Sequence, residues 1–372
     1  MVVVGVAAAQ DQADSSATAD SLLALQLAAQ MQPQTPTPAS PAPVVRATAT
    51  TNPDISAIGD FRMHYTTEGP RNVDPYFHQL EMQVTSVVDP YGRANFIFSL
   101  GKDSLAGDYG IDLEEATLTS LTLPYSLEIK LGKFKPNFTK VNIIHPHAFS
   151  FVDFPVMIDH FFSEEGLYME GISSSILLPN PWDFYQELDF EVGRVVSNAS
   201  LDYGQSDRLL YTAHLKNFFE LSDNSTLELG VSGLTGPNAL DLATTMAGVD
   251  LTYKWKPVQF NTYNSFTWQN EALLCNADTS TGNPVQSYGA YSFMEYQIEK
   301  RMFVGARFDY SGLPMIAKAD ERTESLLFRF QPTEFSIYAL EFQNVNRNYG
   351  PSFKQVVFRV IFGIGTHAAH SY

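Results

Sequence analysis

The sequence contains little cysteine and little positive charge. Cys275 is the single cysteine, which excludes an internal disulfide framework and a thiolate metal site. The 23 Lys and Arg residues are outnumbered by 41 Asp and Glu residues, and the formal net charge is −18. Nucleic acid is therefore not an expected partner, because its phosphates are bound by clustered Lys and Arg.

Long apolar runs are also missing. No stretch of about 18 apolar residues occurs, which excludes a transmembrane helix. Aromatic residues nevertheless make up 13% of the chain, with Tyr and Phe far more frequent than Trp. A lipid-facing wall of strands with interfacial aromatic girdles accounts for such a content. Any crossing of a membrane must therefore be made by strands.

The first 54 residues differ in character from the rest of the chain. Residues 1–9 (MVVVGVAAA) are apolar and end in small residues, which indicates the remainder of a secretory signal peptide. Residues 10–54 combine a short helical pattern at 21–31 with a Pro/Thr/Ala-rich stretch that is typical of an extended linker. We expect residues 55–372 to form the folded unit.

From Ile55 onward the apolar residues recur with a period of two, which predicts strands. About sixteen such runs occur, and most are longer than the usual globular strand of about 5–6 residues. Their length suits a tilted crossing of a bilayer. The runs lie at 55–67, 78–89, 93–103, 113–122, 125–135, 167–178, 186–196, 209–221, 225–236, 244–256, 259–273, 289–300, 302–312, 321–331, 335–347 and 352–365.

Two regularities favour a closed barrel over a soluble two-sheet protein. Short and long connections alternate, as in outer-membrane barrels with short periplasmic turns and longer outer loops. Each strand also has one apolar and one charged face; Phe358 and Phe362, for example, oppose Arg359. An apolar belt needs no cover in lipid if the sheet closes on itself. We therefore predict an all-β fold, a closed antiparallel transmembrane β-barrel of about 16 strands in the bacterial outer membrane, with both termini periplasmic.

Sixteen strands would enclose a lumen too wide for side chains to fill. We expect the inward-facing charges to be solvated, so that they do not each need a partner. The lumen-facing candidates are Arg62, Glu128, Lys130, Glu187, Asp189, Glu191, Lys254, Lys256, Arg307, Asp309, Arg329 and Arg359. Acidic residues outnumber basic ones once the further inward candidates are added, which favours a cation-preferring or non-selective pore. These further candidates are Lys216, Asp60, Glu81, Glu228, Glu271, Glu295, Glu299 and Glu341.

The longest connection, residues 137–166, is the third expected outer loop and is too apolar for a solvated, disordered segment. We expect it to fold into the lumen and narrow the pore. Its constriction candidates are His145, His147, Asp153, Asp159, His160, Glu164 and Glu165. A plain surface loop and a metal site at His145 and His147 are the alternatives, and no resident metal or cofactor is expected.

Several pieces of residues 52–372 resemble a family of bacterial outer-membrane porins distantly related to the phosphate-selective (O/P-type) porins. Members are sometimes described as zinc-regulated TonB-dependent outer-membrane receptors. The resemblance implies a 16-stranded porin fold and fixes no substrate. Fewer than about 55 residues precede the first expected strand, so the plug domain and 22-stranded barrel of such receptors are not expected. The matching pieces are Gly132-Lys133-Phe134, Asn142, His145-Pro146-His147-Ala148, Phe151-Val152-Asp153, Glu164-Glu165-Gly166 and residues 365–372 (GTHAAHSY).

The leading hypothesis is an outer-membrane porin, not an enzyme, that passes small hydrophilic solutes or ions by passive diffusion. A structural or scaffold barrel tethered to an envelope partner is the alternative. An outer-membrane hydrolase is a third, for which only the isolated His64 and His214 are candidates. The expected partners are the lipid bilayer and lipopolysaccharide, the solute or ion, a homo-trimer and, through residues 10–54, a periplasmic protein.

Overall fold

A computed structural model describes residues 53–69, 72–102, 109–182, 184–196, 200–202, 207–260 and 263–365. The expected signal-peptide remnant, the helical pattern at 21–31 and the linker lie outside the described residues. So do residues 366–372, which carry most of the C-terminal motif.

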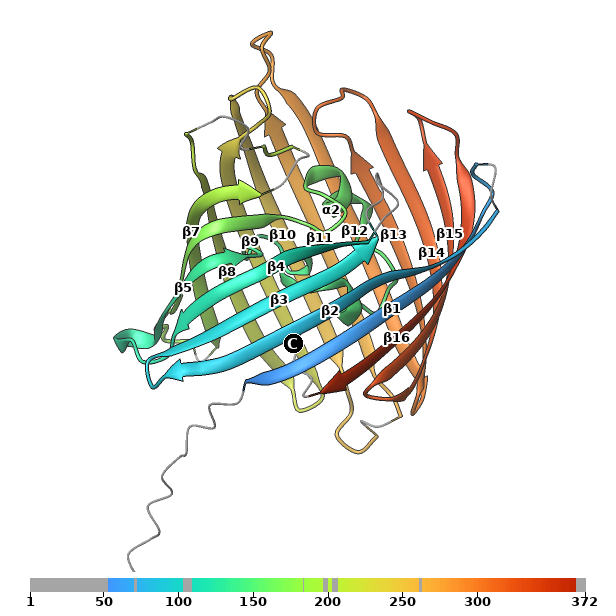
Figure 1. Ribbon diagram of the computed structural model, residues 1–372, viewed down its shortest axis with the longest axis horizontal. Helices are drawn as coiled ribbons and strands as arrows, with labels where there is room; N and C mark the ends of the chain where they lie inside the picture. The colour runs from blue at the N-terminus through green and yellow to red at the C-terminus, as the bar shows by residue number, and fades with distance from the viewer. Residues whose placement is uncertain are drawn as a thin grey trace, which may run out of the picture. The chain divides into compact units, whose positions relative to one another are not determined.

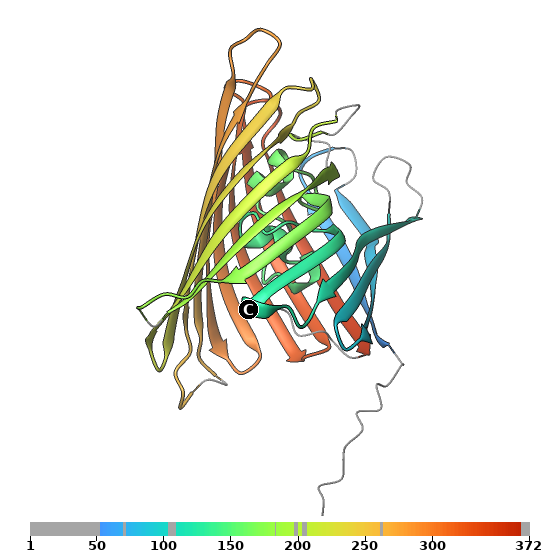
Figure 2. The ribbon, with the colours of Figure 1, turned by 90° about the vertical axis from the view of Figure 1, so that its left-hand side faces the viewer.

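The described chain forms sixteen strands in one closed antiparallel barrel, which confirms the predicted fold class (Figure 1, Figure 2). Neighbours in sequence pair throughout, and β16 closes the ring against β1 with Arg359 opposite Arg62. The strands are β1 (Asp54–Thr66), β2 (Val73–Asp89), β3 (Gly92–Lys102), β4 (Tyr109–Ser120), β5 (Leu127–Phe134), β6 (Tyr168–Leu177), β7 (Tyr185–Val196), β8 (Leu210–Ser222), β9 (Ser225–Pro237), β10 (Ala243–Trp255), β11 (Phe266–Ala277), β12 (Val285–Glu299), β13 (Met302–Gly312), β14 (Asp320–Thr333), β15 (Ser336–Arg347) and β16 (Phe353–Gly365).

Most strands begin and end within a few residues of the expected bounds, with two larger differences. The strand β11 begins at Phe266 instead of 259, because Pro257 and Asn264 favour a turn and outweigh the apolar residues between them. The strand β2 begins at Val73 instead of 78 and contains Pro75, a residue that usually argues against a strand. An irregularity in the pairing of β1 with β2 follows shortly after this proline.

The two faces of the sheet differ as the sequence pattern predicted. Along β10 the residues Val249, Leu251 and Tyr253 point outward, whereas Asp250 and Thr252 point into the barrel and are buried. Large apolar side chains are exposed all round the outer face, which is the arrangement that contact with lipid requires.

Helical structure among the described residues is limited to short pieces: the 3₁₀ turns η1 (Pro124–Ser126), η2 (Val141–Ile143) and η3 (Pro146–Ala148), and the helix α2 (Val156–Phe161). No helix in the described ranges is long and apolar enough to cross a membrane. The turns η2 and η3 and the helix α2 all belong to residues 135–167, the connection between β5 and β6. Both ribbon views show this connection inside the ring of strands (Figure 1, Figure 2).

Candidate functional site

Residues 135–167, the inserted segment, are folded into a compact unit whose two ends are tied together by Asn142. The Asn142 side chain donates to the carbonyl oxygens of Pro136 and Leu167 at 2.9 and 3.2 Å, and its Oδ1 accepts the N–H of Leu167 at 2.8 Å. Gly166 lies against this amide with φ 88°, a conformation that favours glycine. Asn142 and Gly166 both belong to the pieces that resemble the porin family. These contacts give them a structural role, although neither has a reactive side chain.

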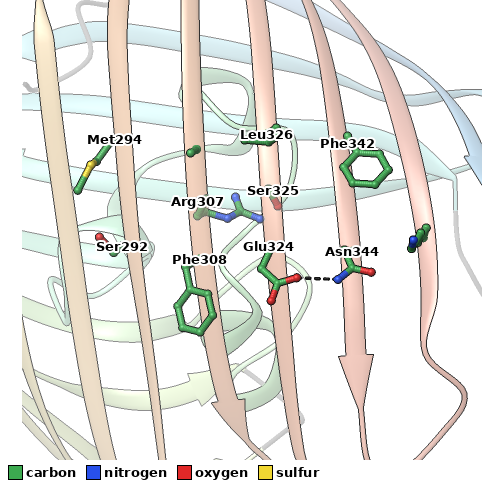
Figure 3. A pocket seen from close by; sticks show the side chains of 11 residues that line it. Ser292, Met294, Arg307, Phe308, Glu324, Ser325, Leu326, Phe342 and Asn344 are labelled. Carbon is green, nitrogen blue, oxygen red and sulfur yellow. Dashed lines mark hydrogen bonds between the residues drawn. The ribbon is translucent and has the colours of Figure 1, made fainter.

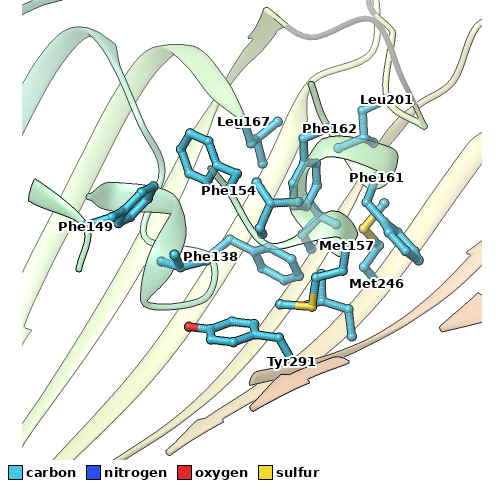
Figure 4. Close-up of a cluster of buried hydrophobic side chains, with 14 of the residues drawn as sticks. Phe138, Phe149, Phe154, Met157, Phe161, Phe162, Leu167, Leu201, Met246 and Tyr291 are labelled. Atoms are coloured by element: carbon cyan, nitrogen blue, oxygen red, sulfur yellow. The ribbon is translucent and has the colours of Figure 1, made fainter. Parts of the chain in front are cut away.

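The apolar side of the inserted segment packs against the wall formed by β9–β12. Phe138, Phe161 and Phe162 are fully buried, and they belong to one cluster with Met246 and Tyr291 of the wall (Figure 4). Fully burying a side chain of this size stabilises a structure by about 1.5–3 kcal/mol.

An inward-facing glycine makes room for the helix α2 at this wall. A Cβ atom at Gly289 would lie 2.6 Å from Cβ of Met157 and 3.2 Å from Cε2 of Phe161. The wall is therefore shaped to receive the segment.

Carboxylates of the wall hold the backbone of the inserted segment. The N–H of Val141 donates to Glu271 Oε1 at 2.9 Å, and the N–H of Val152 donates to Glu341 Oε2 at 2.8 Å. Glu191 accepts the N–H of Asn137 and Asp309 accepts that of Val156 in the same way. These hydrogen bonds satisfy backbone groups that the packed segment hides from water.

Arginines of the wall bind the segment's carbonyl oxygens. Arg307 Nη1 donates to the carbonyl of Asp153 at 2.9 Å. Arg359 donates to the carbonyls of Phe151 and Pro146 at 3.2 and 2.9 Å, and it pairs with Asp60 at 2.8 Å. These wall charges are thus part of the packing of the segment.

The expectation that the inward charges are solvated is therefore wrong for much of the lumen. It assumed an open ring, whereas the segment fills a large part of it, and buried charges then need partners. The strand register turns the lumen-facing candidates inward, apart from Lys256, which follows the end of β10 and is exposed. Glu128, Lys130, Glu187 and Lys254 keep partial or full exposure, and the buried members are Arg62, Asp189, Glu191, Arg307, Asp309, Arg329 and Arg359.

A cavity of about 350 Å³ remains between the inserted segment and the wall of β1, β2 and β13–β16. Arg62 lines it and binds Asp153 of the segment with 2.7 Å between Nη1 and Oδ1. Asp159 and Glu164 of the segment are exposed and line the same space. Withdrawal from bulk water, together with the carboxylates of Glu164 and Glu321, raises the pKa of Asp159 to about 6.

The constriction candidates do not form one cluster. Asp153, Asp159 and Glu164 face the cavity, and His160 lies at its edge with Nε2 3.8 Å from Glu321 Oε2. Burial holds the pKa of His160 below its ordinary value. Glu165 is exposed and does not line this cavity. His145 and His147 lie elsewhere, at the wall of β2 and β4.

His145 is surrounded by carboxylates of β2 and β4. Its Nδ1 lies 3.1 Å from Glu114 Oε2 and 3.4 Å from Glu81 Oε2, and its Nε2 lies 3.1 Å from Glu115 Oε1. His147 Nδ1 is 3.1 Å from the same Glu81 oxygen. Burial alone would lower the pKa of His145, but the three carboxylates outweigh it and hold the pKa well above its ordinary value.

A β-bulge in β4 places two consecutive carboxylates beside His145. The pairing of β3 with β4 shifts between Ile97 and Phe98, so that Ile97 opposes Glu115 and Phe98 opposes Leu113. Glu114 is the extra residue, and both it and Glu115 reach the imidazole. Alternation along the strand would put these neighbours on opposite faces, so no sequence pattern indicates that both carboxylates reach His145.

The geometry does not favour a hydrolase. His214 Nδ1 lies 2.7 Å from Ser232 Oγ, but both residues are buried, and Ser232 Oγ also accepts the N–H of Thr139. His64 pairs with Tyr76 at 3.2 Å. The Ser232 hydroxyl is therefore occupied by packing of the inserted segment.

The outer face of the wall carries a separate groove of about 620 Å³. Met294, Phe308, Leu326 and Phe342 form its apolar lining (Figure 3). At one end Asn344 donates to the carboxylate of Glu324 at 2.6 Å. This groove opens away from the lumen.

The comparisons with known proteins agree with this architecture. No family model matches the sequence. An uncharacterized protein of Aquifex aeolicus (strain VF5) is 25% identical over 335 residues, which cover 78% of this chain and 69% of that protein.

Among solved structures, the anion-selective porin from Comamonas acidovorans has a TM-score of 0.59 at 11% identity, covering 84% of this chain and 99% of that one. The outer membrane channel DcaP of Acinetobacter baumannii has a TM-score of 0.59 at 13% identity, covering 85% and 98%. The trimer form of OmpT of Vibrio cholerae has a TM-score of 0.55 at 8% identity, covering 84% and 100%. The chain has the 16-stranded barrel fold of bacterial outer-membrane porins.

Proposed function

We propose that this protein is an outer-membrane porin that passes small hydrophilic solutes or ions by passive diffusion. The observation that carries the proposal is the charged cavity beside the inserted segment, within a closed barrel whose outer face is apolar. A barrel of this kind needs no energy source and no reacting group to conduct, because its lumen lets solute exchange between the two sides.

The inserted segment would set the width of the pore. It packs tightly against β9–β12 and leaves a cavity toward β1, β2 and β13–β16. Solute would therefore pass along the segment's residues Asp159 and Glu164, beside the ion pair of Arg62 with Asp153. Walls of low dielectric strengthen the field of these groups in the aperture.

The charge of the cavity favours cations. Asp153, Asp159, Glu164 and Glu321 supply four carboxylates, and Arg62 and Arg307 supply two guanidinium groups. The excess of two negative charges would attract cations, while the two arginines keep some positive charge along the path. A Lys/Arg-lined path, which a phosphate-selective pore needs, is not formed by these residues.

The remaining parts of the proposal concern location and partners. The protein would lie in the bacterial outer membrane with both termini periplasmic, in contact with the bilayer and lipopolysaccharide. The fold is shared with the trimer form of OmpT, which supports a homo-trimer here. Residues 10–54 would reach a periplasmic partner.

A scaffold barrel is the second candidate, and a specific observation favours it. The inserted segment and the wall bury apolar and charged side chains together, as a plug would. If the cavity does not continue to both sides of the membrane, such a barrel conducts nothing.

Single-channel conductance of the purified full chain in a planar bilayer tests the proposal. We expect discrete, ohmic openings and a reversal potential in a salt gradient that indicates cation preference. A folded barrel without openings would refute the porin and favour the scaffold.

A further inference from the structure

The Nδ1 atom of His145 is buried among the carboxylates that surround this side chain. The side chain of His145 is 10% exposed, and its Nδ1 makes no hydrogen bond. Carboxylate oxygens of Glu114 and Glu81 nevertheless lie 3.1 and 3.4 Å away, without the geometry of a hydrogen bond. A buried polar atom without a partner costs free energy, so a group that satisfies it is expected.

We propose that His145 Nδ1, Glu81 Oε2 and Glu114 Oε2 bind one divalent transition-metal ion. The three atoms lie within 4.8 Å of one another. Two ligands at about 2.1 Å from a tetrahedral ion are separated by about 3.4 Å, close to the distances found around Nδ1. An ion between the three atoms would also explain why these short contacts do not have hydrogen-bond geometry. Mixed imidazole and carboxylate ligands suit ions such as Zn²⁺ and Co²⁺.

The neighbouring side chains orient the three ligands. The Nε2 of His145 lies 3.1 Å from Glu115 Oε1, so Nε2 can donate a proton to this carboxylate while Nδ1, on losing its own proton, binds an ion. Gln79 donates to Glu114 Oε1 at 2.5 Å, and Tyr168 donates to Glu114 Oε2 at 3.4 Å. The Nδ1 of His147 lies 3.1 Å from Glu81 Oε2 and helps to orient that carboxylate. Such outer partners are typical of built metal sites and unnecessary for a surface acidic patch.

The charge of the cluster also favours a cation. Glu81, Glu114 and Glu115 place three carboxylates around His145, and such a concentration of negative charge attracts a cation. The ion competes with a proton for His145, so binding releases that proton.

The site joins the inserted segment to the wall of β2 and β4, opposite the wall where the segment packs through apolar contacts. Bound metal would therefore fix the segment from a second side. This gives metal ions a structural effect on the pore without requiring that they pass through it.

Metal titration of the folded full chain, after treatment with a chelator, tests the site. Co²⁺ is followed by its visible absorption, and Zn²⁺ is measured by its displacement of Co²⁺. We expect the native protein to bind one more equivalent of each ion than His145→Gln or Glu114→Gln. His160→Gln, which removes an imidazole of the same segment outside the cluster, should bind as the native protein does. Metal bound elsewhere on the chain is common to all variants and cancels in this difference.

Equal binding by the native protein, His145→Gln and Glu114→Gln would refute the proposal, as would a folded native protein that binds neither ion. Heat-modifiable migration on gels establishes that each variant is folded. Should His145→Gln and Glu114→Gln not fold, Glu115→Gln decides, because loss of an outer partner weakens metal binding about 10–100-fold. Unchanged affinity in that variant would equally contradict the site.

Discussion

The two sides of the lumen meet the same inserted segment through different chemistry. The side formed by β9–β12, the packed side, offers Leu234, Met246 and Tyr291 to the segment's phenylalanines. The side formed by β1 and β13–β16, the charged side, offers arginines paired with acids and leaves a cavity. The comparison teaches that an inward-facing position of a barrel does not by itself define a pore-lining residue. The segment determines which positions stay in contact with water.

The largest predicted effect is a loss of folding stability when the ion-pair network of the charged side is broken. Arg359→Ala leaves Asp60, which is 4% exposed, with Arg62 as its remaining guanidinium partner among the described residues. Breaking a buried pair costs about 3–5 kcal/mol, and the second arginine should reduce the loss to about 3 kcal/mol. The measurement is the free energy of unfolding in urea. Lys256→Ala, at an exposed position, should change it by about 0.5 kcal/mol or less; similar losses in both variants would show that Arg359 is solvated after all.

A smaller effect is expected from overfilling the packed side. Gly289→Val places atoms where Met157 and Phe161 lie, at a cost of about 1–3 kcal/mol. The segment should detach in part, and single-channel recordings should show larger or noisier openings. Gly233→Val is the matched control, because a Cβ there meets no atom within 4 Å. Identical recordings from both variants would mean that the segment does not depend on this wall.

Removing a positive charge should change ion selectivity on the charged side and not on the packed side. Arg62→Gln removes a positive charge from the cavity, so the reversal potential in a salt gradient should move toward stronger cation preference. Lys140→Gln removes a charge that pairs with Glu228 at 2.6 Å and does not line the cavity. It should leave the potential nearly unchanged. A shift of equal size in Lys140→Gln would contradict a conducting path along the charged side of the lumen.

The smallest expected effect is a pH dependence of the cavity. The pKa of Asp159 is raised to about 6, so its carboxylate is charged above that pH and neutral below it. Cation preference should therefore weaken as the pH falls from about 7 to about 5. Asp159→Asn should remove this component of the titration, measured from reversal potentials. A titration that persists unchanged in this variant would assign it to another group.

Much of the fold could be predicted because its signals are local. A period of two shows in each strand separately, and the outward Phe358 and Phe362 alternate with Arg359 along a single stretch of chain. The length and apolar content of residues 137–166 likewise indicated a segment that must be buried. These features depend on neighbours in sequence and not on the tertiary contacts.

The details of the site depend on contacts between distant parts of the chain. Glu271 and Glu341 accept backbone N–H groups of the segment, and no sequence pattern predicts such a pairing. The bulge that turns Glu114 inward breaks the alternation on which the assignment of faces rested. The sequence indicates His145 as a candidate ligand, but its partners Glu81 and Glu114 lie on the strands β2 and β4 and cannot be found from spacing.

Single-channel conductance after shortening the inserted segment tests the central claim most directly. The variant lacks residues 142–163, and its folded state is established by heat-modifiable migration. Removing the segment should open the lumen of a 16-stranded barrel, so conductance should rise several-fold and ion preference should fall. Unchanged conductance and selectivity in the folded variant would contradict the claim that this segment sets the pore.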